Sequence, residues 1–150
     1  MRVVVQSVLQ ADVTVAGSRV GDIDRGLLVL VAVEAGDSQE DVEFVSRKLV
    51  NLRIFDDSEG KMDLSVSDIE GKILLISQFT LFGDCRKGTR PSFSRAAPPE
   101  MAEELYVQVG ERIMLEGIPV ETGRFRARME VSSVNEGPVT LIIDSKKKLY

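Results

Sequence analysis

Two apolar segments constrain the fold of this chain more than any other feature. Residues 26–33 contain no polar side chain, and residues 72–80 carry the run Ile-Leu-Leu-Ile at their centre. A strand with one face in water alternates apolar and polar residues, whereas a strand covered on both faces is apolar throughout. Both segments are therefore predicted to be buried strands in a layered fold.

Further strands are predicted on both sides of this centre. Valine-rich or alternating patterns are present at residues 2–9, 11–16, 19–23, 52–55, 128–134 and 139–143. A tight turn at Gly17-Ser18 is expected to join two of these strands. The last two segments are interpreted as a hairpin that closes the chain.

Two helices are predicted between the strands. Residues 37–40 resemble a capping box, and apolar residues at helical spacing follow them. The pair Pro98-Pro99 suits the first turn of a second helix, which Gly117 and Pro119 end. This order of elements favours a mixed α/β layered fold over a regular βαβ repeat, with residues 1–150 as a single domain.

The composition is that of an ordinary globular protein with a formal net charge of −5. Its one cysteine, Cys85, excludes an internal disulfide and indicates a reducing compartment. No apolar run approaches the ~18 residues that span a bilayer, and no signal-peptide pattern follows Met1. A cytoplasmic protein without a membrane partner is therefore expected.

The chain contains no histidine. This excludes a Ser-His-Asp triad, a Cys-His pair, a histidine general base and a histidine-ligated zinc. The acidic segment 56–63 fails the calcium-loop pattern, because Phe55 falls at the first ligand position, and it is interpreted as a turn. The segment 83–89 also fails as a phosphate loop, since Thr89 and Arg90 stand where Lys and Ser/Thr are required. Neither a metal nor a cofactor is expected.

Two short segments carry polar or unusual residues that packing does not require. Ser77-Gln78-Phe79-Thr80-Leu81 places polar side chains at the carboxyl end of a buried strand, where sites are often built. The alternative is that these side chains only satisfy backbone groups as the strand ends. Asn135-Glu136-Gly137-Pro138-Val139-Thr140 is either a special loop or an ordinary hairpin turn.

Cations are concentrated in two places. Arg86, Lys87, Arg90 and Arg95 lie in one loop, and arginines at 124, 126 and 128 alternate with Phe125, Ala127 and Met129. On a strand, this alternation would place three cations on one face. The two stretches are interpreted as a basic footprint for phosphates, with a solvated charged edge as the alternative.

With these motifs the chain closely resembles the bacterial D-aminoacyl-tRNA deacylases. Residues 77–81 match the family signature Ser-Gln-x-x-[Leu/Val], and residues 135–140 match Asn-x-Gly-Pro-x-Thr. Other matching stretches lie at residues 53–55, 88–93 and 122–125, and the likeness covers essentially the whole chain. The resemblance implies a homodimer with a three-layer β/β/α sandwich, in which two barrel-like sheets pack with a helical layer of two main helices.

The resemblance also implies an activity and its partners. The family hydrolyses the ester that links a D-amino acid, or glycine, to the 3′ end of tRNA, and it rejects L-aminoacyl-tRNA as a proofreading step. The expected partners are the acceptor end of aminoacyl-tRNA and a second copy of the chain, but neither DNA nor a membrane. Members are described as using RNA-assisted catalysis, in which the 2′-hydroxyl of the terminal ribose takes part.

The resemblance assigns roles to particular residues. Ser77, Gln78, Phe79 and Thr80 would line the catalytic pocket. Gly137 and Pro138 would reach the partner subunit's pocket through a cis peptide bond and exclude L-amino acids. Phe125 and Met129 would contact the terminal adenosine or close the site. Arg90, from the basic loop described above, is the remaining candidate substrate-binding residue.

Two positions depart from the family pattern. Ser7 stands where members usually carry an arginine that is expected to brace the Gly-Pro loop. Arg126 stands where a small residue is usual, so it would alter the pocket rim or add a phosphate contact.

Thr80 is the obvious candidate nucleophile, but no spacing in the sequence points to a base that would activate it. The preferred interpretation is that the substrate's 2′-hydroxyl orients water or relays protons, and that the backbone N–H of Phe79 or Thr80 binds the oxyanion. Two other functions remain open from the sequence: a non-catalytic protein that binds RNA ends or a small ligand, and a general esterase that uses Thr80.

Overall fold

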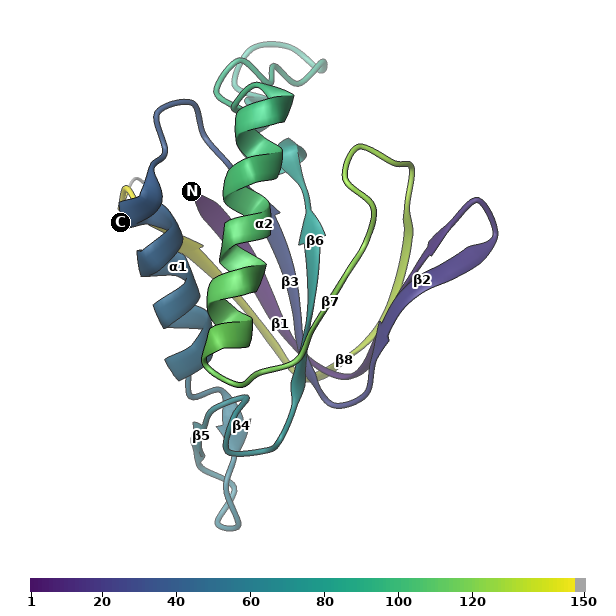
Figure 1. Cartoon of the computed structure of the whole chain (residues 1–150), viewed down its shortest axis with the longest axis vertical. Coiled ribbons are helices and arrows are strands. Elements are labelled where there is room, and N and C mark those ends of the chain that lie inside the picture. Colours follow the sequence, from purple (N-terminus) through teal and green to yellow (C-terminus); the bar gives the residue numbers. More distant parts are fainter. Residues whose placement is uncertain (148–150) are drawn as a thin grey trace.

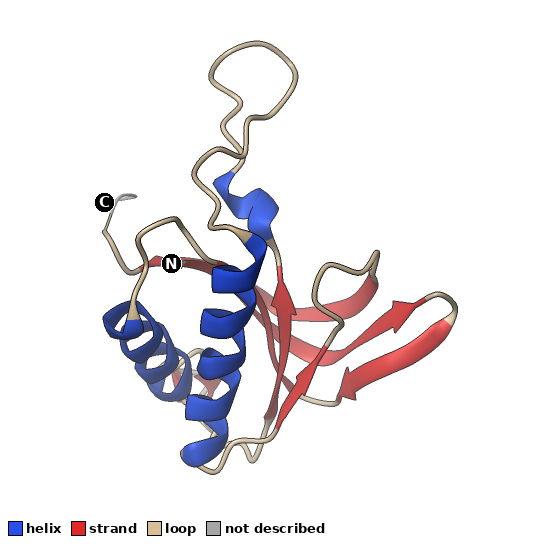
Figure 2. Cartoon of the chain, turned by 45° about the horizontal axis from the view of Figure 1, so that its top comes forward, coloured by secondary structure: helices blue, strands red, loops and turns tan. Residues whose placement is uncertain are grey.

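The computed structural model describes residues 1–147, which form one large sheet, one small sheet, two α-helices and a short 3₁₀ helix (Figures 1 and 2). The large sheet contains β1 (Arg2–Val15), β2 (Ser18–Ile23), β3 (Gly26–Ala32), β6 (Lys72–Ser77), β7 (Val120–Thr122) and β8 (Glu130–Asp144). The small sheet contains β4 (Phe55–Asp56) and β5 (Met62–Leu64). The helices are α1 (Gln39–Asn51), η1 (Phe79–Phe82) and α2 (Pro99–Leu115).

The large sheet has the order β2-β1-β3-β6-β7, and β8 pairs with β1. The two strands predicted from the apolar segments, β3 and β6, are parallel neighbours in its middle. Their side chains are almost entirely buried, as predicted. Their carboxyl ends therefore lie together at one edge of the sheet.

Both helices cover one face of this sheet (Figure 1). Val29 and Leu75 point from the sheet into a core that includes Val45 of α1 and Val109 of α2. Residues of alternate parity on the same strands, such as Leu28, point to the other face. The central strands are thus covered on both sides.

The second face is covered by the chain itself. The C-terminal half of β1, together with β2, folds back over this face. As a result, Val8, Val13 and Ile23 pack against Leu74 and other residues of the central strands. At Gly21 on β2 an added Cβ would lie 2.8 Å from the carbonyl oxygen of Thr122, so glycine permits the close approach of β2 to β7. The sheet nearly closes into a barrel, and the three layers agree with the expected β/β/α arrangement.

The helix predictions are confirmed. Ser38 is the N-cap of α1, and its backbone N–H donates a 2.9 Å hydrogen bond to the Asp41 side chain, which is the capping partner instead of Glu40. Pro99 begins α2, and Gly117 follows its end with a φ of +83°.

Several strand predictions are wrong in their limits or their pairing. Residues 2–9 and 11–16 belong to the single strand β1, and the buried strand at 72–80 ends at Ser77. The segments 128–134 and 139–143 form no hairpin, because they are two parts of β8 that both pair antiparallel with β1. A bulge between them keeps the chain running in one direction, whereas Gly-Pro in sequence is typical of a turn. The acidic segment 56–63 does turn, between β4 and β5.

Candidate active site

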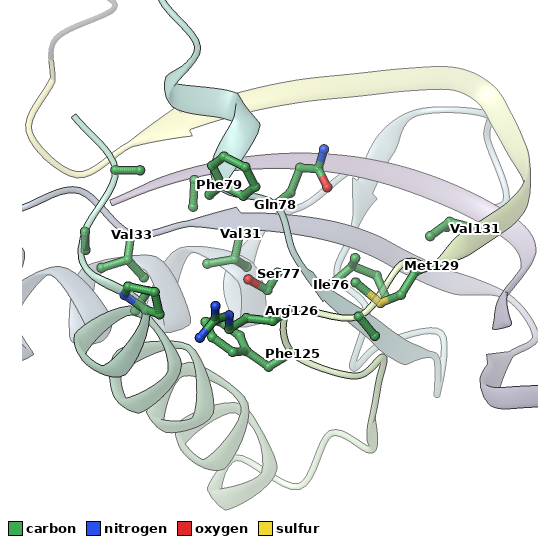
Figure 3. A pocket seen from close by; sticks show the side chains of 16 residues that line it. Val31, Val33, Ile76, Ser77, Gln78, Phe79, Phe125, Arg126, Met129 and Val131 are labelled. Carbon is green, nitrogen blue, oxygen red and sulfur yellow. The ribbon is translucent and has the colours of Figure 1, made fainter. Parts of the chain in front are cut away.

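A cavity of about 430 Å³ lies at the carboxyl ends of β3 and β6 (Figure 3). Its walls come from these strand ends, from the start of α2 and from the loop after β7. Most of the lining is apolar, and its polar side chains are those of Ser77, Gln78 and Arg126. An apolar cavity with a few polar groups is the usual form of a small-molecule site.

The end of β6 supplies two of the polar side chains of the cavity, those of Ser77 and Gln78. The Gln78 N–H donates a 2.7 Å hydrogen bond to the Val31 carbonyl, and the chain then turns into η1. The Gln78 side-chain amide donates a 2.5 Å hydrogen bond to the hydroxyl of Thr80. Thr80 is exposed and does not line the cavity itself, so of the predicted catalytic residues Ser77, Gln78 and Phe79 contribute to the wall.

Aromatic rings flank the cavity. Phe79 is 54% exposed, and its ring packs against the Phe93 ring in an edge-to-face arrangement with a centroid distance of 5.0 Å. Phe125 lines the opposite side, 6.2 Å from the ring of Tyr106 on α2. The Tyr106 hydroxyl donates a 2.7 Å hydrogen bond to the Leu75 carbonyl, and burial raises the pKa of this phenol well above its usual value.

Tyr106 and Phe93 were not predicted as neighbours of the site. Tyr106 lies next to the apolar stripe of α2, so in sequence it resembles a core residue. Phe93 belongs to the family-matching stretch 88–93, which was the only signal for it. Met129, predicted to bind substrate, does line the cavity.

Gly137 and Pro138 do not line the cavity of their own chain. They lie in the bulge of β8 opposite Ser7, which pairs with Leu27, whereas the cavity begins at Val31 of the same strand. Four residues along a strand correspond to about 13 Å. Both Gly137 and Pro138 are exposed, and the peptide bond between them is cis, as the resemblance implied.

The bulge is held by hydrogen bonds from buried and half-buried groups. The hydroxyl of Ser7 donates a 2.7 Å hydrogen bond to the Glu136 carbonyl. The side-chain amide of Asn135 donates to the carbonyls of Ser7 and Val139, at 2.9 and 3.0 Å. Arg25 forms an ion pair of 3.2 Å with the Glu136 carboxylate. Ser7 therefore holds the loop, although the resemblance led us to expect an arginine in this bracing role.

The two basic stretches differ from the prediction. Residues 124–128 form a turn and not a strand, because the Ala127 N–H donates to the Arg124 carbonyl and Arg126 has a φ of +61°. In the first loop, Arg95 pairs with Glu34 and Arg86 pairs with Asp84. The Arg86 guanidinium holds the pKa of Asp84 well below its usual range.

The other two cations of that loop, Lys87 and Arg90, form no ion pair with a carboxylate of residues 1–147, and both are exposed. Residues 1–147 contain no group of three or more Cys, Asp or Glu side chains that would hold a metal ion. They also contain no helix long and apolar enough to cross a bilayer.

Comparison with solved structures defines the fold class first. A chain titled "c-Myc DNA Unwinding Element Binding Protein" superposes with a TM-score of 0.91 at 40% identity, covering 97% of this chain and 99% of the other. The fold is also that of a "probable eukaryotic D-amino acid tRNA deacylase", with a TM-score of 0.84 at 20% identity, covering 95% and 97% of the two chains.

The family follows from the sequence comparisons. Residues 4–144 match the family described as D-Tyr-tRNA(Tyr) deacylase, and the chain belongs to this family. A D-aminoacyl-tRNA deacylase of Brevibacillus brevis is 57% identical over 145 residues, covering 97% of this chain and all of the relative. One of Thermosipho africanus is 54% identical over 147 residues, covering 98% of this chain and 99% of the relative.

Proposed function

We propose that this protein hydrolyses the ester that links a D-amino acid, or glycine, to the 3′ end of tRNA, and that it rejects L-aminoacyl-tRNA. The observation that carries the proposal is the position of the motif Ser77-Gln78-Phe79-Thr80. Ser77, Gln78 and Phe79 line the cavity and Thr80 follows them directly, in a chain that belongs to the deacylase family. The partner is accordingly the acceptor end of aminoacyl-tRNA.

The cavity suits the terminal adenosine. Its volume of about 430 Å³ lies in the usual range for small-molecule sites. The rings of Phe79 and Phe125 offer faces on which a base stacks, a contact worth about 1–3 kcal/mol. Met129 closes the side of the cavity nearest β8 (Figure 3).

The chemistry of the motif favours catalysis assisted by the substrate. The Thr80 hydroxyl accepts its hydrogen bond from an amide, and an amide N–H does not take up a proton. The chain has no histidine to act as a base. The 2′-hydroxyl of the terminal ribose, next to the ester, would orient the attacking water or relay its proton.

The protein's part is to position the ester and stabilise the oxyanion. The N–H groups of Phe79 and Thr80 begin η1, where a helix leaves its donors free, and no acceptor bonds to them within residues 1–147. One oxyanion donor is typically worth about 2.7–4 kcal/mol. DNA ends lack the 2′-hydroxyl and would not be substrates.

Selection against L-amino acids is assigned to Gly137 and Pro138 of a second subunit. These exposed residues lie away from their own cavity, and the Ser7 and Asn135 hydrogen bonds fix their loop. Backbone atoms of such a loop would form a wall where an L side chain projects. This is selection by rejection, so glycine is accepted together with D-residues.

A homodimer would bring the two parts of the site together. β8 pairs only with β1 among the described strands, and its other edge is open. Val134, Leu141 and Ile142 on β8 are 37–50% exposed, as expected of a surface that a second copy covers. A cytoplasmic location agrees with the exposed free thiol of Cys85.

The direct test is incubation with D-tyrosyl-tRNA, L-tyrosyl-tRNA and glycyl-tRNA(Ala), with measurement of the released amino acid. Release from the D and glycyl substrates alone supports the proposal. Cleavage of simple activated esters without tRNA would favour a general esterase, and binding without release would favour an RNA-end binding protein. Light scattering at micromolar concentration should give the mass of a dimer, and a fully active monomer would contradict the two-subunit site.

A further inference from the structure

Among the described residues that line the candidate active site, Arg126 alone has an ionisable side chain. We infer that its guanidinium binds the 5′-phosphate of the terminal nucleotide and thereby sets the direction in which the substrate enters the cavity. This inference rests on the proposed function, because it concerns the same cavity. It adds a phosphate subsite to the proposed site.

The surroundings of Arg126 leave its charge available. The rest of the lining is apolar except for Ser77 and Gln78, neither of which carries a charge (Figure 3). No carboxylate of residues 1–147 lies within 4.0 Å of the Arg126 guanidinium, whereas Arg86 and Arg95 in the nearby loop each have one. Arg126 is exposed, so a ligand can reach its guanidinium, and guanidinium matches phosphate with two parallel hydrogen bonds.

The local backbone conformation places one of three neighbouring arginines, Arg126, in the cavity wall. The turn closed by the Ala127 N–H and the Arg124 carbonyl places Arg126 at a φ of +61°. Arg126 lines the cavity, whereas Arg124 and Arg128, two residues before and after it, do not. The charge in the cavity is therefore a property of one position, and its neighbours are natural controls.

The position of the charge also orients the ligand. The guanidinium repels the α-ammonium group of an aminoacyl ester, so the amino acid must lie away from Arg126 and towards Gln78. A nucleotide then fits with its base between the aromatic walls and its phosphate at Arg126. A second source of negative charge would be the carboxylate of an acidic aminoacyl side chain, and the experiment separates the two.

The test compares binding of adenosine 5′-monophosphate and adenosine to the intact protein by calorimetry or ligand-observed NMR. The wild-type protein should prefer the monophosphate by about tenfold, the value of one charge-assisted hydrogen bond. Arg126→Ala should remove this preference, and Arg126→Lys should keep part of it. Arg128→Ala is the matched control and should retain the full preference. Arg126→Gly, which adopts a positive φ freely, repeats the test if alanine disturbs the turn.

Kinetics give an independent measure. Arg126→Ala should raise KM for D-tyrosyl-tRNA about tenfold with little change in kcat, and should reduce the magnitude of the salt slope by about 0.7. Equal binding of monophosphate and adenosine by the wild type would overturn the inference, as would an Arg128→Ala variant that loses the preference equally. The inference would also be overturned if Arg126→Ala lost cleavage of D-aspartyl-tRNA but kept cleavage of D-asparaginyl-tRNA. That result would show that Arg126 binds the carboxylate of an acidic aminoacyl side chain.

The two claims fail separately. A wild-type protein that binds the monophosphate through Arg126 but does not cleave D-tyrosyl-tRNA would refute the proposed function and leave the phosphate subsite standing. If the protein cleaves D-tyrosyl-tRNA but Arg126→Ala changes neither monophosphate binding nor KM, the phosphate subsite is refuted and the proposed function stands.

Discussion

The side-chain amide of Gln78 donates a 2.5 Å hydrogen bond to the hydroxyl of Thr80. This contact occupies the threonine oxygen with a donor and supplies no group that can remove its proton. The hydrogen bond therefore fixes the positions of the Thr80 and Gln78 side chains relative to each other. It does not activate Thr80 as a nucleophile.

A first prediction follows for Thr80. Thr80→Val keeps the shape of the side chain but removes its hydroxyl, so kcat for D-tyrosyl-tRNA should fall by less than about tenfold, since one neutral hydrogen bond is worth about 1 kcal/mol. Loss of an acting nucleophile would cost several orders of magnitude. Single-turnover hydrolysis measures the difference, and a variant without detectable activity would restore Thr80 to the nucleophile's role.

Ser7 provides the second prediction. Its side chain is buried, and Ser7→Ala leaves the half-exposed Glu136 carbonyl without the 2.7 Å hydrogen bond, at an expected cost of about 0.5–1.5 kcal/mol in unfolding free energy. Because the loop that carries Gly137 becomes less fixed, the ratio of D- to L-tyrosyl-tRNA cleavage should also fall.

Gln6→Ala is the matched control for Ser7→Ala. Gln6 is the neighbouring residue, and its exposed hydrogen bond to Thr140 does not reach the loop tip. Its selectivity ratio should equal that of the wild type. Equal ratios for both variants, measured in parallel with urea unfolding, would show that Ser7 does not position the loop.

The third prediction concerns the salt dependence of tRNA binding. Arg90 is exposed in the loop beside the cavity, so Arg90→Ala should reduce the magnitude of the salt slope by about 0.7–0.9 if it contacts one phosphate. Lys61 in the β4–β5 hairpin, at the opposite end of the molecule, is an exposed control cation (Figure 1). Binding titrations between low and high salt compare the two, and identical slopes would remove Arg90 from the interface.

The fourth prediction concerns acid stability. Burial raises the pKa of Asp41, but hydrogen bonds from Lys146, Ser145 and the Ser38 backbone outweigh it and lower the pKa to about 2. The ordinary value is 3.8, so the folded state binds this proton more weakly than the unfolded state. The contribution of Asp41 to stability is therefore full above about pH 4 and is lost as the pH falls towards 2.

Asp41→Asn should accordingly lower the unfolding free energy by on the order of 2 kcal/mol near neutral pH. The difference from wild type should disappear near pH 2. Asp56→Asn in the exposed β4–β5 hairpin is the control and should stay within about 0.5 kcal/mol of wild type. A wild-type to Asp41→Asn difference that stays constant from pH 7 to pH 2 would contradict this assignment.

Local signals in the sequence predict the helices and the central strands well. Ser38 and Pro99 fix the helix starts through capping and a preset φ, which depend on neighbours in sequence. The apolar segments predict β3 and β6 because strands buried on both faces have no polar face to show.

The pairing of β8 was not predictable in the same way. Gly137-Pro138 is a typical turn signal, and only the hydrogen bonds to β1 on both sides show that the strand continues. The alternation at residues 124–128 likewise resembles a strand, but these residues have no partner strand among the described residues and form a turn. Whether a segment forms a strand or a turn here depends on which part of the chain, distant in sequence, lies next to it in space.

The candidate site divides along the same line. The motif at Ser77 is local and was predicted, as was the contribution of Phe125 and Met129 through the resemblance. The contacts of Phe93 and Tyr106 with the site, and the separation of Pro138 from its own cavity, arise from tertiary packing and from a bulge in β8. The residues alone do not specify them.

The most direct test of the central claim is single-turnover hydrolysis of D-tyrosyl-tRNA that ends in either adenosine or 2′-deoxyadenosine. If the 2′-hydroxyl carries the proton chemistry, the deoxy substrate should bind with similar affinity but react roughly 10²–10⁴-fold more slowly, the range for a lost general acid–base group. Equal rates for the two substrates would contradict the account.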